Sequence, residues 1–208
     1  MKKLFIVGAG GFGRELHAWA GRHPDCGVRW ELAGFLDDNN EAIAEYGVFA
    51  PLHPLRGHQP SADALYLNGL ALPELKQQLL PSLLAAGAEF LTFVDPTAKV
   101  GERVALGRGA VLCPGAIVTA DATLGEFVTL NLRATVGHDA IVGDWTTASA
   151  HCDITGFVKV GEGVFMGSRA SIIPGRHVGA GAKLAAGAVV FADVAPGVTV
   201  FGNPARVL

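Results

Sequence analysis

The sequence has few cysteines, no excess of basic charge and no apolar run long enough to cross a bilayer. Its most apolar stretch, residues 79–94, contains Pro81 and Glu89, whereas a membrane-spanning helix needs about 20 apolar residues. The apolar segment at residues 4–7 is too short for a signal peptide. The net charge of −3, with mixed signs, gives no basic footprint for nucleic acid. We therefore expect a cytoplasmic protein with no membrane span and no nucleic-acid partner.

Cysteine and histidine spacing disfavours disulfides and a metal site. The three cysteines are irregularly spaced, which fits neither a disulfide framework nor a zinc site, at Cys26, Cys113 and Cys152. The last three histidines, His138, His151 and His177, lie too far apart along the chain for a local pair of ligands. We expect no metal, and we expect Cys113 and Cys152 to be structural.

What the chain does contain is a repeat with a period of six residues. A mostly large aliphatic side chain recurs at sixteen positions, namely Val100, Leu106, Leu112, Val118, Leu124, Leu130, Val136, Val142, Ala148, Ile154, Val160, Met166, Ile172, Val178, Leu184 and Val190. Two residues before each lies a second series of smaller residues, broken only by Arg176, namely Ala98, Val104, Ala110, Ala116, Ala122, Val128, Ala134, Ala140, Thr146, Cys152, Val158, Val164, Ala170, Arg176, Ala182 and Ala188. Gly often follows the aliphatic position, at residues 101, 107, 125, 137, 143, 161, 167 and 179.

A period of six fits neither a helix nor a flat strand, whose apolar periods are 3.6 and 2 residues. It describes one side of a triangular prism, in which the aliphatic residue fills the interior, the small residue fits at the bend and Gly accommodates the corner backbone. Three sides then make a coil of 18 residues, and coils stack about 4.8 Å apart. Such stacking buries a core that no single repeat could bury. At Arg176, the one large member of the small series, we expect a distorted or bulged corner.

This repeat resembles that of the hexapeptide-repeat acyltransferases, which implies a left-handed parallel β-helix. Residues 18 apart should lie above one another, so Ala120 and Gly156 should flank His138 and leave a notch beside it. Trp145 should stack beside Phe127 and form an apolar patch suited to a neighbouring subunit.

The first 95 residues predict a small Rossmann-like βαβ domain. A buried strand at residues 4–7 leads into the Gly-rich turn that contains Gly8, Gly10, Gly11 and Gly13, and a helix follows at residues 14–20. Strand, Gly-rich turn and helix together form the context in which such a turn holds a phosphate. Further elements are expected as a strand at 28–36, a loop at 39–60, a strand at 64–67 and a helix at 73–86.

The second strand ends in Asp37 and Asp38, which could bind hydroxyls or a base edge. A dinucleotide site needs two mononucleotide halves, so about 95 residues suit a single nucleotide better. The alternative is that the glycines only pack the helix on the sheet.

Together, a Rossmann-like domain (residues 1–95) and a β-helix with a C-terminal cap (residues 96–208) resemble the NeuD/PglD family of sugar acetyltransferases. The resemblance is carried by IVGAGGFGRE, FLDD and the hexapeptide repeat. It implies acetyl transfer from acetyl-CoA to a sialic acid or a nucleotide-linked amino sugar, in bacterial surface glycan biosynthesis, by a homotrimer with sites between subunits. The stretch after the third strand, residues 67–70, departs from the family's Ile-Gly-Asn turn and has no Arg close behind it, which leaves the acceptor open.

The segment Asn131–Asp139 matches the family's active-site segment. By that resemblance His138 is the general base, Asp139 orients it, and Asn131 lies near the acceptor. The chemistry agrees, because a nucleophile that attacks a thioester must lose a proton and a His suits that task near neutral pH. An adjacent carboxylate fixes the tautomer of the His and stabilises its imidazolium.

The resemblance also implies where acetyl-CoA binds. Backbone at Gly156, Ser168 and Ala186 would meet the pantetheine arm, and the ending that contains Pro204 and Arg206 would lie against the coenzyme, where a cation can meet phosphate. That ending could instead cap the open edge of the β-helix. Relatives carry a second His nine residues after the first, where this chain has Thr147; whether His151 replaces it or is a surface residue stays open.

Three other functions stay open. The same site could acetylate a hydroxyl, as in O-acetylation of sialic acid, although a sugar without phosphate gives the Gly-rich turn little to bind. The GxGxxG turn could instead belong to an NAD-binding protein or oxidoreductase. The β-helix could also be a catalytically silent scaffold.

Overall fold

The computed structural model describes residues 1–39, 41–46 and 50–208, with the side chain of residue 45 excepted. It divides into two compact units: Met1–Ala71 with Leu75–Leu91, and Leu72–Glu74 with Thr92–Leu208. Within the described ranges, no helix has the length and apolar character that crossing a membrane requires.

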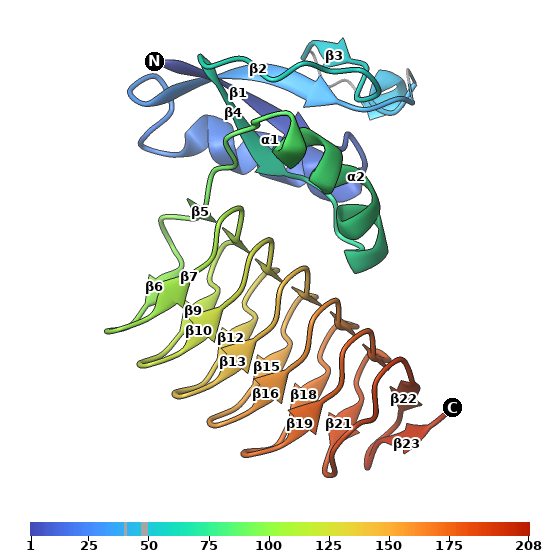
Figure 1. Ribbon diagram of the computed structural model, residues 1–208. Helices are drawn as coiled ribbons and strands as arrows, with labels where there is room; N and C mark the ends of the chain where they lie inside the picture. Colours follow the sequence, from blue (N-terminus) through green and yellow to red (C-terminus); the bar gives the residue numbers. More distant parts are fainter. Residues whose placement is uncertain (40, 47–49) are drawn as a thin grey trace. The chain divides into compact units, whose positions relative to one another are not determined.

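The N-terminal unit is a parallel sheet with strand order β3-β2-β1-β4 (Figure 1). Its strands and helices are β1 (Lys2–Val7), α1 (Gly11–Arg22), β2 (Trp30–Leu36), the 3₁₀ turn η1 (Ala44–Tyr46), β3 (Leu52–His53), β4 (Ala64–Asn68) and α2 (Pro73–Ala85). The predicted strands and helices are therefore confirmed. The predicted loop at 39–60 is wrong in part, because η1 and β3 fall within it, and its residues 40 and 47–49 lie outside the described part of the chain.

The strand order of this sheet creates a topological switch point at β1. β1 lies between β2 and β4: the chain passes from β1 through α1 to β2 on one side, and after β3 it returns to β4 on the other side of β1. In open parallel sheets ligands bind at such a topological switch point. Leu16 and Ala20 of α1 are buried against the sheet, and all five residues of β4 are buried, which makes a rigid base for the turn after β1.

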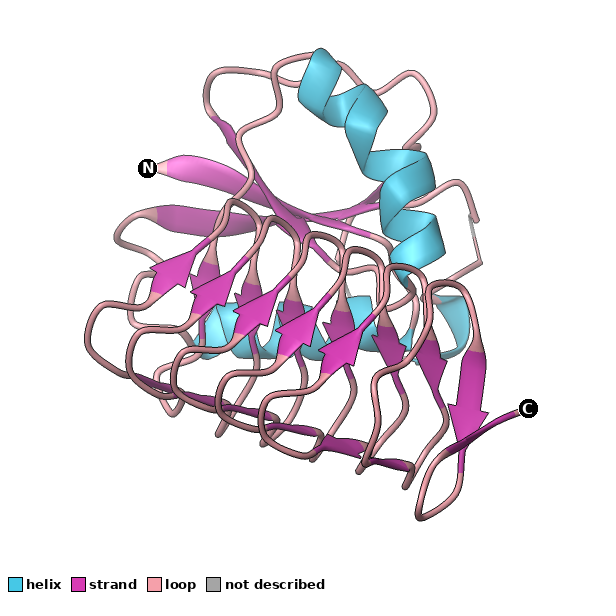
Figure 2. Cartoon of the chain, turned by 60° about the horizontal axis from the view of Figure 1, so that its bottom comes forward, coloured by secondary structure: helices cyan, strands magenta, loops and turns pink. Residues whose placement is uncertain are grey.

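The C-terminal unit is a three-sided column of short parallel strands (Figure 2). One side is a six-stranded sheet of β6 (Lys99–Val100), β9 (Ile117–Val118), β12 (Thr135–Val136), β15 (Asp153–Ile154), β18 (Ser171–Ile172) and β21 (Val189–Val190). The next is a five-stranded sheet of β7 (Ala105–Leu106), β10 (Thr123–Leu124), β13 (Ile141–Val142), β16 (Lys159–Val160) and β19 (His177–Val178). The third is an eight-stranded sheet of β5 (Phe93–Val94), β8 (Val111–Leu112), β11 (Thr129–Leu130), β14 (Thr147–Ala148), β17 (Phe165–Met166), β20 (Lys183–Leu184), β22 (Thr199–Phe201) and β23 (Arg206–Val207).

The predicted coil of three six-residue sides is confirmed. Thr135 pairs with Asp153, Ile141 with Lys159 and Thr147 with Phe165, so each residue pairs with its equivalent three sides further along the chain. From Ala110 onward the aliphatic and small series are buried, Arg176 excepted, whereas Val100 in the first coil is 41 % exposed. The core is thus one continuous column that each coil extends.

Other predicted packing is also observed. The Phe127 and Trp145 rings stack 4.6 Å apart and nearly parallel, at 5°. The three cysteines, all within the described ranges, form no disulfide, and Cys113 and Cys152 are buried. Burial raises the pKa of the Cys152 thiol to about 11, so this side chain packs as a neutral core group.

The prediction that the Gly after each aliphatic residue accommodates the corner backbone is wrong, because the left-handed conformation falls at another position of the repeat. The glycines after the aliphatic residue lack a positive φ; they are needed because coils approach closely, and a Cβ at Gly137 would lie 2.5 Å from the Gly156 nitrogen. The left-handed backbone falls two residues later, every six residues from Arg103 (φ 55°) to Gly187 (φ 71°), and nine of these positions hold residues other than Gly.

Arg176 does not distort its own corner, so that expectation is also wrong. Lys159 and His177 keep the regular pairing between successive coils. The irregularity comes one coil later, where Val178 bridges Val194 and Lys183 pairs with Thr199, so that this coil is shorter by two residues. The shortened segment brings Asp193 within 3.9 Å of the Arg176 guanidinium, which lets this large side chain sit at the edge of the column.

Candidate active site

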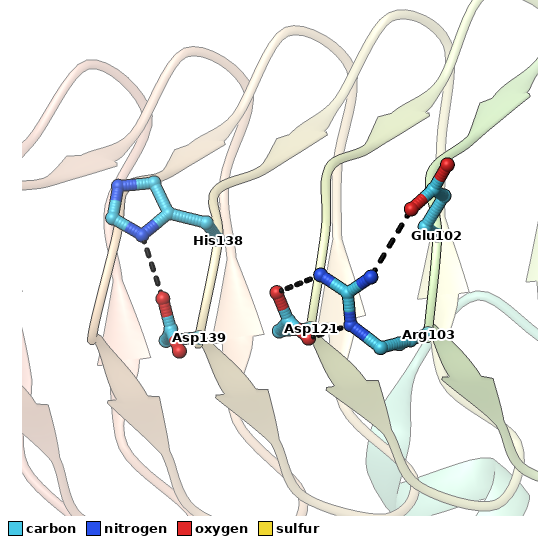
Figure 3. Close-up of polar contacts among 5 residues, drawn as sticks. All are labelled: Glu102, Arg103, Asp121, His138 and Asp139. Carbon is cyan, nitrogen blue, oxygen red and sulfur yellow. Dashed lines mark hydrogen bonds and ion pairs between the residues drawn. The ribbon is translucent and has the colours of Figure 1, made fainter.

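His138 and Asp139 lie on the corner between the six-stranded and five-stranded sheets. We call this corner, made by residues 101–103, 119–121, 137–139, 155–157 and 173–175 in successive coils, the His138 corner. The His138 Nδ1 and Asp139 Oδ2 atoms are 2.8 Å apart (Figure 3). The two side chains are 58 % and 45 % exposed, so the pair is formed yet accessible.

The local backbone explains how two adjacent residues form this pair. Asp139 occupies the left-handed position of the corner, with φ 58°, a conformation that Asp tolerates better than most residues. Its backbone N–H donates to the Ala120 carbonyl of the preceding coil at 3.2 Å. The sharp turn directs the carboxylate back toward the ring of His138. With Nδ1 paired in this way, Nε2 is the ring nitrogen that Asp139 does not hold.

The imidazole itself fills the predicted notch on the Gly156 side. A Cβ built on Gly156 would lie 2.7 Å from Nε2 and 2.8 Å from Cε1 of His138. Phe157 packs edge-on against the ring, with centroids 5.0 Å apart and planes at 89°. The absence of a side chain at residue 156 is therefore what allows the ring to take this place.

In the two preceding coils, the same corner carries an ion pair that sequence analysis did not single out. The Arg103 guanidinium donates to both oxygens of Asp121, with Nε–Oδ1 2.6 Å and Nη2–Oδ2 2.8 Å (Figure 3). The Arg103 hydrogen bond holds the pKa of Asp121 below its usual value. The sequence signal was the regular spacing of Arg103, Asp121 and Asp139, one coil from each to the next.

Asn131 lies on a different corner of the column from His138. It precedes β12, and His138 follows it, so the six-stranded sheet separates them. The Asn131 Oδ1 atom accepts the Leu132 backbone N–H at 2.6 Å. We call this second corner, made by residues 113–115, 131–133, 149–151, 167–169 and 185–187, the Asn131 corner. Within one chain, the fold does not bring these two predicted site residues together.

A groove of about 540 Å³ follows the Asn131 corner, lined by Thr97, Pro114, Gly115, Leu132, Arg133 and His151. His151 stacks between Arg133 and Arg169, as its spacing predicted: its N–H donates to the Leu132 carbonyl, and the Arg169 N–H donates to that of Ala150. This places His151 beside a groove.

The predicted coenzyme-binding residues are distributed over both corners and the C-terminal end. Ser168 and Ala186 lie on the Asn131 corner, whereas Gly156 lies on the His138 corner. Pro204 and Arg206 lie at the end of the column, where β23 pairs antiparallel with β22. Arg206 is exposed.

In the N-terminal unit, the Gly-rich turn divides into glycines that pack and glycines that are open. A Cβ on Gly13 would lie 1.9 Å from the Gly8 carbonyl oxygen, whereas one on Gly10 would meet nothing within 4 Å. Gly10 is also the N-cap of α1 and provides no side-chain cap. Free helix N–H groups beside open space form a site that suits an anion.

The two acidic residues after β2 face different surroundings. The Asp37 Oδ2 atom accepts the Ala9 N–H of the Gly-rich turn at 2.8 Å, and the Asp38 Oδ1 atom accepts the Arg56 N–H at 2.8 Å. Asp38 lines a pocket of about 390 Å³ with Arg56, His58, Gln59 and Gln78 among its other residues. Burial, and then the neighbouring His53, lower the pKa of His58, so its ring is neutral at neutral pH.

Known proteins match nearly the whole chain. GDP-perosamine N-acetyltransferase of Escherichia coli O157:H7 is 30% identical over 210 residues, which cover 97% of this chain and 94% of that protein. A family model described as the hexapeptide repeat of succinyl-transferase matches residues 157–192. The chain belongs to the hexapeptide-repeat sugar acetyltransferase family.

Solved structures of this family share the fold over its full length. The acetyltransferase domain of PglB from Neisseria gonorrhoeae FA1090, in complex with acetyl coenzyme A, has a TM-score of 0.85 and 29% identity, and covers 100% of this chain and 99% of its own. PerB from Caulobacter crescentus, in complex with CoA and GDP-perosamine, has a TM-score of 0.84 and 26% identity, and covers 100% and 98%. The predicted family and the predicted class of enzyme, an acetyltransferase, are confirmed.

Sequence analysis did not single out Arg56 and His58, which line the pocket beside Asp38. Arg56 and His58 come from the segment expected to be a plain loop, and β3 brings that loop beside β2. Their only sequence signal was the concentration of His and Arg between residues 53 and 58. Among the described residues, no group of three or more His, Cys, Asp or Glu side chains is arranged to hold a metal ion.

Proposed function

We propose that this acetyltransferase moves the acetyl group of acetyl-CoA to the amino group of a nucleotide-linked sugar, with His138 as the general base. The observation that carries the proposal is the accessible His138–Asp139 pair, 2.8 Å between Nδ1 and Oδ2, on a corner of the β-helix. The E. coli relative is a GDP-perosamine N-acetyltransferase, which favours an amine over a hydroxyl as the acceptor and disfavours the NAD-dependent and scaffold alternatives.

The proposed chemistry is direct transfer. The neutral amine attacks the thioester carbonyl, a C–N bond forms, and the proton that the amine loses passes to Nε2 of His138. Asp139 stabilises the imidazolium through Nδ1. The C–S bond then breaks, and the imidazolium returns the proton to the departing thiolate of CoA. Most of the remaining catalysis is positioning of the two substrates.

The nucleotide belongs, in this proposal, to the N-terminal unit. The phosphates would bind the Gly8–Gly13 turn, where Gly10 and Gly11 leave the backbone accessible, and Asp37 or Asp38 would bind a hydroxyl or the base. These two carboxylates have different hydrogen-bond partners, so we expect them to have different roles. Asp37 holds the turn through Ala9, which makes Asp38, at its pocket, the better candidate for a direct contact.

We also propose that the site is shared between copies of the chain in a homotrimer. Asn131 lies one side of the prism away from His138, as do Ser168 and Ala186. A second copy whose Asn131 corner faces the His138 corner of the first would assemble one complete site, with acetyl-CoA along the seam and Arg206 near its phosphates. The mass from light scattering would then be three times 21.5 kDa.

The test is release of free thiol from acetyl-CoA with a panel of acceptors: GDP-perosamine, UDP- and dTDP-linked 4-amino sugars, and sialic acid. We expect turnover with an amino sugar that carries a nucleotide, and a loss of at least about 100-fold in His138→Asn. If sialic acid is the only acceptor that gives turnover, the reaction is O-acetylation and not the proposed N-acetylation. No thiol release with any acceptor, or full activity in the His138 variant, would refute the proposal.

A further inference from the structure

Three charged residues are stacked on the His138 corner in consecutive coils. Arg103, Asp121 and Asp139 each occupy the left-handed position of their coil, with φ of 55°, 60° and 58°. Figure 3 shows them in line, with His138 beside Asp139 and Glu102 beside Arg103. The Arg103 Nη1 atom lies 3.1 Å from the Glu102 Oε2 atom.

This stack places two carboxylates in adjacent coils. Coils are separated by about 4.8 Å, and like charges at such distances repel each other. Arg103 offsets that repulsion, because its guanidinium fork holds both oxygens of Asp121 at 2.6 and 2.8 Å. The fork also fixes the direction of the Asp121 carboxylate, toward Arg103.

The charges on this corner act on one another across the coils. The pKa of Arg103 is raised mainly by its hydrogen bond to Asp121, with a smaller contribution from Asp139. The pKa of Asp121 is lowered first by Arg103, with His138 also contributing. The next coil presents Gly156 and Phe157 to His138 and carries no charge on this corner. Besides His138, the charged residues on the His138 corner are therefore Asp139, Asp121, Arg103 and Glu102.

We propose that Arg103 and Asp121 are positioning residues for His138 and Asp139: Arg103 neutralises Asp121 and directs it away from the imidazole, so that Asp139 remains the partner of His138. The proposal rests on the proposed role of His138 as the base. It predicts a charge dependence that a purely structural ion pair would not show. Loss of Asp121 makes the surroundings of His138 more positive by one unit, and loss of Arg103 makes them more negative by one unit.

The experiment follows the protonation of His138 in the full-length protein in three variants: Asp121→Asn, Arg103→Gln and the double variant. The primary measurement is the pH titration of the His138 Cε1–H signal by NMR, assigned from its absence in His138→Asn. We expect the midpoint to move down in Asp121→Asn and up in Arg103→Gln, each by about 0.5 pH unit, as for one unit charge several ångströms away at an exposed site. The double variant should return close to the wild-type midpoint.

The acidic limb of the pH profile of kcat/KM should move in the same directions, measured with the acceptor that gives turnover. The matched control is Arg108 and Glu126, an ion pair that also joins successive coils, 2.8 Å long, on another corner of the column. Arg108→Gln and Glu126→Gln should leave both the titration and the profile unmoved. Thermal melting of each variant checks that it is folded.

Shifts in the same direction for the two single variants, no shift in either, or a double variant no closer to wild type than the singles would overturn the proposal. The NMR arm needs no turnover, so it separates the two proposals. If His138→Asn keeps its activity while the opposite shifts appear, the base assignment fails, and what survives is the control of His138 protonation by Arg103 and Asp121.

Discussion

Gly156→Ala is the sharpest perturbation of the His138 corner, because the three nearest heavy atoms to the added Cβ all belong to one ring. They are Nε2, Cε1 and Cδ2 of His138, at 2.7, 2.8 and 3.2 Å. Real Cβ contacts below 3.0 Å are essentially never seen, and an ordinary contact begins at 3.4 Å. The ring must therefore retreat by about 0.7 Å or more, or rotate away from Asp139.

The expected result is a large loss of activity with little loss of stability. A misplacement of about 1 Å at a reacting group can lower the rate by about 100-fold, so we expect kcat/KM for thiol release to fall by that order. His138 is 58 % exposed and can swing outward, so the melting temperature should change by only a few degrees.

Because Gly156 is also proposed to contact the coenzyme, the assay must separate a displaced ring from blocked binding. A displaced ring lowers kcat and changes the NMR titration of His138 without any ligand, whereas a blocked coenzyme raises KM for acetyl-CoA and leaves that titration unchanged. The matched control is Gly156→Ala in a His138→Ala background. The added methyl group then meets no ring, so it should change neither kcat nor KM for acetyl-CoA relative to His138→Ala alone. Wild-type kcat and an unmoved His138 signal in Gly156→Ala would refute this account of the corner.

Three further predictions concern the pair, the Gly-rich turn and the pocket. Asp139→Asn should lower kcat more than it raises KM for acetyl-CoA, because the amide cannot stabilise the imidazolium of His138; equal activity in thiol release would contradict the pairing. Gly13→Ala should lower the free energy of unfolding by about 1–3 kcal/mol, because its Cβ would lie 1.9 Å from a carbonyl oxygen, whereas Gly10→Ala should melt like wild type and weaken binding of GDP by isothermal titration. The pKa of His58 is lowered below 6.5 in the folded state, so the unfolded chain binds the proton more tightly and stability should decline as pH falls through about 6.5. In His58→Gln this decline in melting temperature between pH 7.5 and pH 5 should be smaller, and an unchanged slope would contradict the assignment.

Most of the β-helix could be predicted from the sequence because its period is a global property. Every coil uses the same three sides. A residue that departs from the repeat pattern, such as Ala148 or Arg176, therefore does not change the register of the other positions. The strand-turn-helix order of the first 36 residues could be predicted for a related reason, since local turn chemistry determines it.

What could not be predicted is the role of each corner residue. The left-handed position recurs every six residues, yet Arg103, Phe127 and His151 occupy it as readily as Gly does. Stacking against the neighbouring coils imposes this conformation, at a cost of roughly 1–2 kcal/mol for a residue with a Cβ. The glycines two residues earlier are needed because successive coils pack closely there. The sequence alone does not distinguish a Gly required by close packing from a Gly in the left-handed conformation.

The same stacking explains why the His138–Asp139 pair can exist at all. Two neighbours in a strand point to opposite faces, so an adjacent His and Asp in a flat strand could not form this pair. At the His138 corner, the positive φ of Asp139 turns its carboxylate back onto the ring. The preceding coil holds the Asp139 backbone N–H through the Ala120 carbonyl, and the following coil leaves room for the His138 ring at Gly156. The geometry of the pair is therefore a property of three coils, and a substitution one coil away can alter it without touching either residue of the pair.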